Sequence, residues 1–345
     1  MKLEKKKLCF RCITDPKKGY GNFARALLLA EEMKRRNFSI FFIIEKNSTI
    51  EILLKERKIS FYKLTPSKSK IVETKKILKI LQKNNCHNIV LDMREYGETL
   101  SKKLVRHVYV ILIDDAWGKN VYANIIFNGT MIKKFHNYKI KNPNSQVFLG
   151  TDYWLSDQNF LKSQKTTHNI QNLKQPIVTI SMGGSDPDEL TFIVYRSISH
   201  LSNIKIQIII GPFFKKKLQL KNEVKNNENT SVIVNPKNIW NKFSKSDLII
   251  SNAGSTLFEL AILRLPVICI SVVDHQIPYA KFFQRKGSIK YLGFKNTISE
   301  KKISLAVIDL LKNKPKRKTM FTACKSIIDG KGLFRVSSII GKKII

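Results

Sequence analysis

The 345-residue sequence predicts an α/β protein made of two Rossmann-like, doubly wound domains that face a cleft. Three observations predict this class. Short apolar segments alternate with segments of helical periodicity in two successive series, which is typical of parallel sheets covered by helices. A polar segment rich in Asn, Gln, Ser and Lys separates the two series. Glycine-rich turns follow three of the predicted strands, at the carboxyl ends where sheets of this kind bind ligands.

The first series is assigned to an N-terminal domain of residues 1–150. It begins with a strand at residues 8–14 and a helix at residues 23–36. Residues 39–44 are almost continuously apolar, which indicates a strand buried on both faces. The alternation continues with strands at 60–64, 88–91, 107–113, 125–127 and 147–149 and helices at 49–57 and 71–84.

The second series is assigned to a C-terminal domain of residues 176–330, after a linker at 151–175. A proline between the last two predicted helices, Pro315, is placed to start the second of them. Residues 331–345 are expected to form a basic C-terminal tail. The expected elements of this domain are strands at 177–181, 204–210, 231–234, 248–250 and 267–270 and helices at 253–263, 299–311 and 316–328.

The net charge of +36 does not indicate a nucleic-acid-binding protein. Only 12 of the 62 basic residues are arginines, and the lysines occur in every segment instead of clustering with aromatic residues. We therefore expect no nucleic-acid partner. The charge should raise the local concentration of anionic substrates and permits peripheral contact with anionic membrane surfaces.

Membrane insertion and export are not predicted. No apolar run approaches the length of a membrane span. The basic N-terminus leads directly into a strand-like run and lacks the apolar core and cleavage site of a signal peptide. We expect a soluble, cytoplasmic monomer.

The five cysteines give no metal site. Cys9 and Cys12 form a C-x-x-C pair inside a predicted strand, where residues three apart face opposite sides. No second pair follows at zinc-binding spacing. Buried free thiols are the expected state, which agrees with a reducing compartment.

The turn that follows the strand at 248–250 has the composition of an anion site. The first N–H groups of a helix lack intrahelical partners and carry partial positive charge. Gly254 lets a phosphate approach the backbone, and Ser255 and Thr256 add hydroxyl donors. Glu259 lies one helical turn further on, where its carboxylate can accept both ribose hydroxyls. The alternative is an ordinary capped turn with a solvated glutamate.

Two further turns are expected at the same cleft. In the first, Gly19 and Gly21 allow a tight backbone, Asn22 caps the helix or points into the cleft, and Arg25 can approach a phosphate or sugar oxygen.

The other turn follows the strand at 177–181 and contains two glycines. Ser185 or Asp186 is expected to cap a helix that has Pro187 at or near its first position. For both turns the alternative is a plain strand-to-helix connection.

Five motifs carry a resemblance to a known family: GYGNFAR, IDD at 113–115, LGTDYWL, ISMGGSDP and SNAGSTLFELA…LP…DHQ. In order and spacing they resemble the PseG-like UDP-sugar hydrolases of pseudaminic acid biosynthesis, relatives of the MurG-type glycosyltransferases. The match extends to about residue 293. The resemblance implies a GT-B fold, no cofactor or metal, and hydrolysis of the anomeric C–O bond of a UDP-linked diacetamido-trideoxy sugar with inversion.

The resemblance also implies residue roles. The 254–256 turn would hold the diphosphate and Glu259 the ribose. Gln276 of the DHQ segment would lie at the nucleotide-sugar site, so we assign Gln276, Asn252 and His275 to substrate binding. A surface role for His275 remains the alternative. The loop residues Ser185 and Asp186 would lie at the cleft or serve only as caps.

One position departs from the family pattern. The pattern in the first turn is G-x-G-H-x-x-R, in which the histidine is the proposed general base. This sequence has Asn22 there, and an amide can orient water but cannot take its proton near neutral pH. Loss of general-base assistance costs on the order of 10²–10⁴ in rate. Asp15, Asp92 or Asp115 could act as the base instead.

Three function classes follow. A nucleotide-sugar hydrolase is the leading one. A GT-B glycosyltransferase, whose acceptor brings its own nucleophile, would explain the missing histidine. A protein that binds a UDP-sugar without turning it over efficiently is the third.

Overall fold

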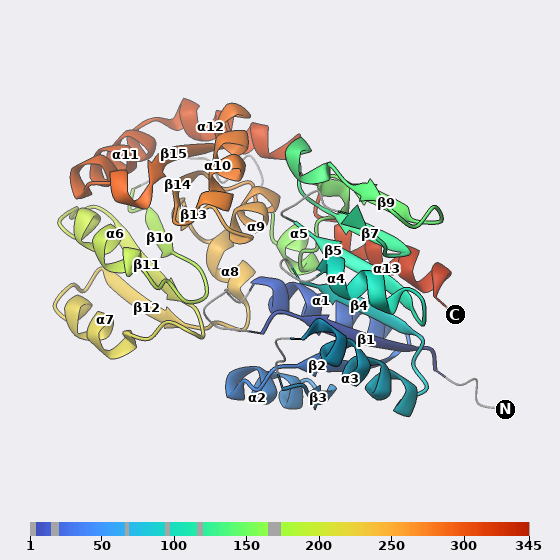
Figure 1. Cartoon of the computed structure of the whole chain (residues 1–345). Helices are drawn as coiled ribbons and strands as arrows, with labels where there is room; N and C mark the ends of the chain where they lie inside the picture. The colour runs from blue at the N-terminus through green and yellow to red at the C-terminus, as the bar shows by residue number, and fades with distance from the viewer. Residues whose placement is uncertain are drawn as a thin grey trace. The chain divides into compact units, whose positions relative to one another are not determined.

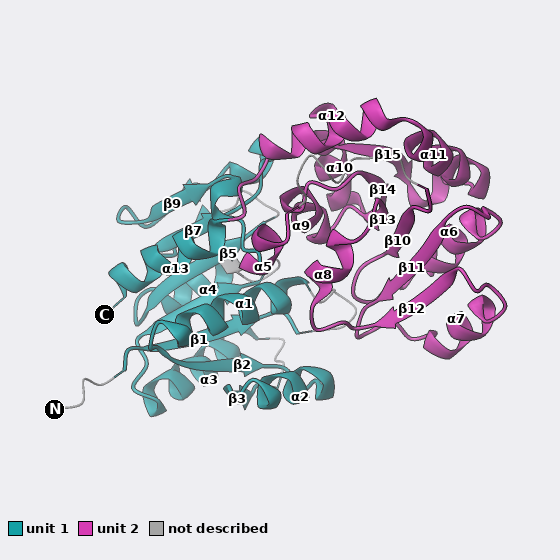
Figure 2. Cartoon of the chain, turned by 180° about the vertical axis from the view of Figure 1, so that it is seen from behind, with its two compact units in different colours: residues 1–157, 331–345 teal, residues 158–330 magenta. Residues whose placement is uncertain are grey.

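The computed structural model describes residues 5–14, 21–65, 69–93, 97–115, 120–164 and 174–344. The chain divides into two compact units, one of residues 1–157 and 331–345 and one of residues 158–330 (Figures 1 and 2). Each unit contains a parallel sheet with helices on both faces, so the predicted pair of Rossmann-like domains is confirmed. No helix within the described ranges is both long and apolar enough to cross a membrane.

The first unit has a seven-stranded sheet of order β3-β2-β1-β4-β5-β7-β9. Every strand pair in it is parallel. Its strands are β1 (Lys7–Cys12), β2 (Ser39–Ile44), β3 (Ser60–Lys63), β4 (Asn88–Asp92), β5 (Tyr109–Asp114), β7 (Ile125–Asn128) and β9 (Gln146–Leu149). Its helices are α1 (Gly21–Arg35), α2 (Ser48–Glu56), α3 (Lys70–Lys83), α4 (Gly97–Leu104) and α13 (Gly332–Lys343). A small separate ladder pairs β6 (Asn120–Val121) with β8 (Lys139–Ile140).

The second unit has a six-stranded parallel sheet of order β12-β11-β10-β13-β14-β15. Its strands are β10 (Ile177–Ser181), β11 (Lys205–Ile210), β12 (Thr230–Val234), β13 (Leu248–Asn252), β14 (Val267–Ser271) and β15 (Ile289–Phe294). Its helices are α5 (Gln158–Lys162), α6 (Leu190–Ile198), α7 (Lys217–Val224), α8 (Ile239–Ser244), α9 (Thr256–Ile262), α10 (Ile277–Arg285), α11 (Glu300–Lys312) and α12 (Lys314–Lys325). Pro315 lies in the first turn of α12, as predicted.

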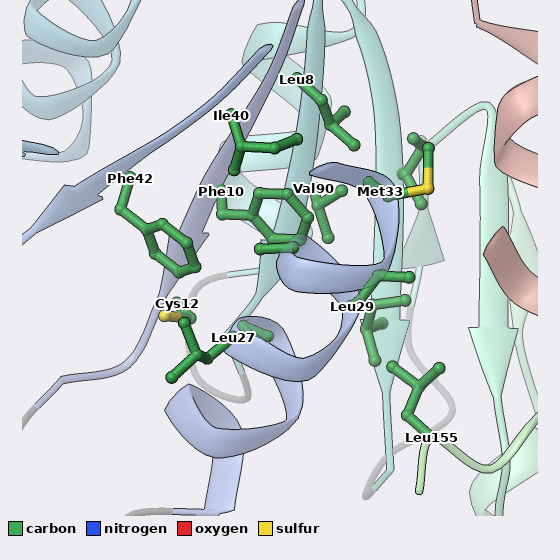
Figure 3. Packing of buried hydrophobic residues seen from close by; sticks show 14 of the residues in the cluster. Leu8, Phe10, Cys12, Leu27, Leu29, Met33, Ile40, Phe42, Val90 and Leu155 are labelled. Carbon is green, nitrogen blue, oxygen red and sulfur yellow. The ribbon is translucent and has the colours of Figure 1, made fainter. Parts of the chain in front are cut away.

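Apolar side chains cover both faces of the first sheet. On one face Phe10 stacks on Phe42 with ring centroids 5.1 Å apart, beneath Leu29 and Met33 of α1 (Figure 3). The strand alternation sends Cys12 to this face and Cys9 to the opposite one, which α3 and α4 cover. The described cysteines are all buried and unpaired, which confirms the prediction of buried free thiols.

The strand orders locate the crevice of each sheet. In a doubly wound sheet the connections between strands run in opposite directions along the sheet on the two sides of one strand pair. Ligands bind beyond the carboxyl ends of that pair. The reversal lies between β1 and β4 in the first unit and between β10 and β13 in the second. The turns after these four strands therefore form the expected binding edge of each unit.

The C-terminal residues correct one expectation. Residues 332–343 form helix α13 instead of a basic tail. Its apolar positions Leu333, Val336 and Ile340 recur at helical spacing and are buried in the core of the first unit against α1. The segment expected as a linker contains a 3₁₀ turn at Thr151–Tyr153 and helix α5, and the boundary between the units falls between residues 157 and 158.

Two glycines enclose the backbone of Trp154 in the first unit. A Cβ atom on Gly332 would overlap the carbonyl of Trp154, and one on Gly129 would overlap its Cα. We expect Gly332→Ala to lower the free energy of unfolding by about 1–3 kcal/mol, because backbone atoms must move to admit the methyl group. Gly341→Ala on the same helix meets no atom within 4 Å and is the matched control.

Urea unfolding of the two variants measures this difference. Gly341→Ala should be neutral or stabilising by about 0.5–1 kcal/mol, since alanine is the better helix residue. Equal stabilities for the two variants would show that the contact of α13 with Trp154 is not tight.

Candidate functional site

The binding edge of the first unit holds a buried polar cluster from α1, β4 and β5. Arg25 donates to both carboxylate oxygens of Asp92, at 2.7 Å from Nε and 2.6 Å from Nη2, and to Asp115 at 2.8 Å from Nη1. Asn22 donates from Nδ2 to Asp92 at 2.6 Å. Asp92 is 1% exposed. The first-turn residues of α1 are thus tied to the carboxyl ends of the two neighbouring strands.

Burial and charge act in opposite directions in this cluster. Burial raises the pKa of Asp92 above its ordinary value, although Arg25 works to lower it. Burial alone would lower the pKa of Arg25, but the carboxylates of Asp115 and Asp92 raise it well above the usual range. Among the described residues, Arg25 therefore contacts both carboxylates of this cluster.

The structure therefore places Asn22 and Arg25 differently from expectation. Arg25, expected to approach a phosphate or sugar oxygen, is held by two carboxylates. The amide nitrogen of Asn22 donates to Asp92. The amide oxygen of Asn22 is a hydrogen-bond acceptor. Gly21 begins α1. Asp15 and Gly19 lie outside the described residues.

A second ion cluster lies on the other side of β1. Arg11, 1% exposed, contacts Glu45 at 2.9 Å and Glu73 at 3.1 Å. Lys70 contacts the second oxygen of Glu73 at 2.9 Å. Charges here balance, and the contacts join β1, α3 and the residue after β2. Sequence reasoning missed this cluster, because a lone arginine inside an apolar strand gives no sign of its partners.

Sequence reasoning also missed a polar network after β5 and β7. The side chain of Asn128, the last residue of β7, donates to the Tyr138 hydroxyl at 2.6 Å, and that hydroxyl donates to Asp114 at 2.7 Å. Asn128 also accepts from the backbone N–H and the hydroxyl of Thr130. Thr130 in turn contacts His136. The signal that could have found it is the polar residue at each strand end, Asp114 and Asn128.

In the second unit, the turns after β10 and β11 touch through glycines. A Cβ on Gly211 would overlap the backbone of Gly184, and Gly183 has a φ of 97°, which favours glycine. Asp186 accepts from the backbone N–H groups of Leu190 and Thr191, the first two residues of α6. The N-cap residue is Glu189, so neither Ser185 nor Asp186 holds the predicted cap position, but the Asp186 side chain satisfies the first two N–H groups of the helix. The helix begins three residues beyond Pro187, so the prediction of a proline at its start is wrong.

The turn after β13 is held by two amide side chains. Asn252 donates to the Met182 carbonyl at 2.8 Å and accepts from the Gly254 N–H at 3.2 Å, so it bridges the two turns at the reversal point. Gln276, 7% exposed, accepts from the Val272 N–H at 2.9 Å. The Nε2 donor of Gln276 then lies near Gly254. A Cβ atom added to Gly254 would be 3.7 Å from that nitrogen.

The other predicted residues of this edge lie around the same turn. Ser255 is exposed, and Thr256 and Glu259 are partly exposed on α9. Ser185 and His275 are partly exposed in the turn after β10 and in the 3₁₀ turn Asp274–Gln276. The accessible Ser255 and Thr256 present hydroxyl and N–H groups beside Gly254, a surface suited to an anion. No three His, Cys, Asp or Glu side chains within the described ranges are grouped as a metal site.

The second unit is similar to a known domain family. Residues 178–331 match the glycosyltransferase family 28 C-terminal domain. The chain is 21% identical over 329 residues to the spore coat polysaccharide biosynthesis protein SpsG of Bacillus subtilis, covering 94% of each chain. It is 28% identical over 190 residues to the pseudaminic acid cytidylyltransferase and UDP-2,4-diacetamido-2,4,6-trideoxy-beta-L-altropyranose hydrolase of Helicobacter pylori, covering 54% of this chain but 34% of that protein.

Solved structures establish the fold. MurG of Acinetobacter baumannii superposes with a TM-score of 0.68 at 15% identity, covering 98% of this chain and 99% of that one. HepE of Anabaena, solved with UDP-glucose, superposes with a TM-score of 0.62 at 10% identity, covering 97% and 99%. The fold is GT-B, and residues 178–331 are similar to the C-terminal domain of family 28 glycosyltransferases.

Proposed function

We propose that this chain hydrolyses a UDP-linked diacetamido-trideoxy sugar at the anomeric C–O bond and releases UDP. The observation that carries the proposal is the Gly254 turn, where the amide side chains of Asn252 and Gln276 lie beside the glycine at the start of helix α9. The family 28 match over this unit and the UDP-sugar bound by HepE support a nucleotide sugar as ligand. The hydrolase named in the Helicobacter pylori relative supports the reaction.

In the proposed reaction the second unit receives the leaving group. Gly254 lets the diphosphate approach the turn, Ser255 and Thr256 bind it with N–H and hydroxyl donors, and the dipole of α9 stabilises the charge that develops on UDP. Glu259 accepts the ribose hydroxyls. Asn252 holds the turn in place, and Gln276 donates to the diphosphate or to the sugar.

The first unit supplies water to the anomeric carbon. Asn22 orients the water through its amide oxygen, because its nitrogen is engaged by Asp92. The water proton passes to Asp15 or Asp115, and the departing UDP oxygen takes the electron pair of the broken C–O bond. Arg25 fixes the relative positions of Asp92 and Asp115.

A glycosyltransferase is the second candidate, and position 22 favours it. An acceptor hydroxyl would replace water, and the orienting role of Asn22 would suffice for an acceptor activated elsewhere. The family 28 match and the similarity to MurG are consistent with this reaction. The two candidates share the nucleotide site and differ in whether UDP is released without an acceptor.

The nucleotide assignment predicts the effect of Glu259→Gln. Replacing the carboxylate weakens its bonds to the ribose hydroxyls, and hydrogen bonds to a charged group contribute about 1.5–3 kcal/mol each. We expect the Kd for UDP to rise at least about tenfold, measured by titration calorimetry.

Glu228→Gln changes the same charge at an exposed position of the second unit and should leave the Kd unchanged. Equal affinities for the two variants would remove Glu259 from the nucleotide site. A wild-type chain that does not bind UDP would contradict the proposed function itself.

A further inference from the structure

Helix α3 of the first unit has an exposed face that is aliphatic at its first turn and basic along the rest. Its buried side, which includes Ile77 and Leu81, packs on the sheet. With about 3.6 residues per turn, the exposed positions fall on a single continuous strip of the helix surface. Apart from Gln82, the exposed side chains of α3 are aliphatic or lysine: Ile71, Val72, Lys75, Lys76, Lys79 and Lys83.

The aliphatic end of this strip is open to solvent. Ile71 is 55% exposed, and its neighbour Val72 is 42% exposed. A single exposed aliphatic side chain is ordinary on a protein surface. Here two adjacent ones lie directly before a row of lysines, which gives the strip an apolar end and a basic body.

The lysines of the strip have no acidic counterpart on the surface of α3. The acidic residue of this helix, Glu73, is 2% exposed and is held by Arg11 and Lys70. Helix α2, which packs on the opposite face of the sheet, differs in this respect, because Glu51 and Glu56 accompany its basic residues. The unbalanced positive charge is therefore a property of α3 and not of every helix in this lysine-rich chain.

The basic surface continues onto the elements beside α3. Helix α4 contacts α3 and β6, and its Leu100 and Leu104 share the core cluster of Ile77. Both Lys102 and Arg106 are exposed at this helix. The acidic residue of α4, Glu98, is half-buried and accepts from Asn120 at 3.1 Å. We call the exposed residues of α3 and α4 the basic face.

The composition of α3 favours a lipid surface over other polyanions. Nucleic-acid-binding surfaces combine arginine with aromatic residues, and the exposed strip of α3 contains neither. Lysine is depleted at protein–protein interfaces. Anionic bilayers attract lysine clusters on amphipathic helices, and aliphatic side chains add to the affinity by entering the boundary between headgroups and acyl chains.

We propose that the basic face docks the chain on an anionic lipid bilayer. Ile71 and Val72 enter the headgroup boundary, and the lysines of α3 lie against the lipid phosphates. The contact is peripheral and reversible, because two short aliphatic side chains bury little area and the lysine contribution is screened by salt. The inference goes beyond the proposed function, and it needs neither a nucleotide nor the second unit.

Co-sedimentation of the full chain with lipid vesicles tests the charge. Binding to vesicles of phosphatidylcholine and phosphatidylglycerol should be at least about tenfold tighter than binding to phosphatidylcholine alone. It should be lost in about 1 M salt, where the Debye length is about 3 Å. Lys75→Ala/Lys79→Ala should weaken it about 20-fold. The control Lys314→Ala/Lys318→Ala removes the same charge at the same spacing on α12 and should have no effect.

A second pair of variants tests the aliphatic end. Ile71→Ser should weaken binding to the mixed vesicles about fivefold. Ile52→Ser, on α2, changes an isoleucine that is 57% exposed and should leave binding unchanged. All the changed side chains are exposed, so each variant should keep a thermal unfolding midpoint near that of the wild type.

Three results would overturn the inference. The first is equal binding of the wild-type chain to the two kinds of vesicle. The second is equal binding by Ile71→Ser and Ile52→Ser, which would reduce the face to a general attraction for polyanions. The third is displacement of the chain from the vesicles by an oligonucleotide that binds it more tightly, which would make nucleic acid the partner. The Kd for UDP is measured separately and bears only on the proposed function.

Discussion

Arg25→Met is expected to destabilise the chain by about 3–5 kcal/mol. Removing one partner of a buried ion pair leaves an uncompensated charge, and here it removes the cation that contacts both Asp92 and Asp115. Arg57→Met is the matched control in the same unit. Arg57 lies 3.3 Å from Glu31, and its side chain is half exposed. This ion pair should contribute no more than about 1 kcal/mol to the free energy of unfolding.

The pH dependence gives this prediction a second readout. Burial already raises the pKa of Asp92, and loss of Arg25 should raise it further. A carboxyl group whose pKa is higher in the folded state favours folding when it is protonated, and that contribution disappears as the pH rises through the folded-state pKa. The loss of free energy of unfolding caused by Arg25→Met should therefore be largest at neutral pH. It should shrink as the pH falls towards the ordinary pKa range of aspartate.

Denaturant unfolding of both variants at neutral and acidic pH measures these differences. If Arg25→Met lowers the free energy of unfolding no more than Arg57→Met does, the buried contacts of Arg25 do not stabilise the fold as expected. A loss independent of pH would show that Asp92 and Asp115 do not carry the unpaired charge.

Asn22→His is expected to raise the rate of UDP release by about 10²-fold. An imidazole can take the proton of the attacking water, and general-base assistance contributes on the order of 10²–10⁴ in rate. Asp92, which accepts from the Asn22 amide at 2.6 Å, is placed to accept from the ring N–H and to stabilise the imidazolium that forms. The carboxylate that orients such a base is therefore already present.

Asn22→Ala is the comparison variant, because it removes the orienting amide without adding a base. Its rate should fall below that of the wild type. Thermal unfolding of both variants checks that Asn22, which is 6% exposed, tolerates each replacement. If Asn22→His folds and binds UDP but releases it no faster than the wild type, position 22 does not contact the attacking water.

The sequence alone predicts the fold because the fold depends on local periodicity. Strand alternation in β1 places Cys9 and Cys12 on opposite faces, and the apolar run of β2 gives a strand buried on both sides. The one large correction, α13 in place of a tail, also has a local signal in Leu333, Val336 and Ile340 that the basic residues within and around the segment obscure.

The contacts of the site could be predicted only in part. The contact of Asp186 with the start of α6 is visible in the sequence because its partners lie four and five residues away. The partners of Arg25 lie 67 and 90 residues away, and only the strand order brings them to it. The contact of His136 with Thr130 depends on how the turn after β7 folds, which the sequence does not show.

The most direct test of the central claim is to incubate the wild-type chain with the UDP-linked diacetamido-trideoxy sugar, without any acceptor, and to measure released UDP. We expect steady release of UDP and free sugar in equal amounts over many turnovers. Tight binding of UDP without release from this donor or related UDP-amino sugars would contradict it. That result would favour a transferase that requires an acceptor, or a chain that binds the nucleotide sugar without hydrolysing it.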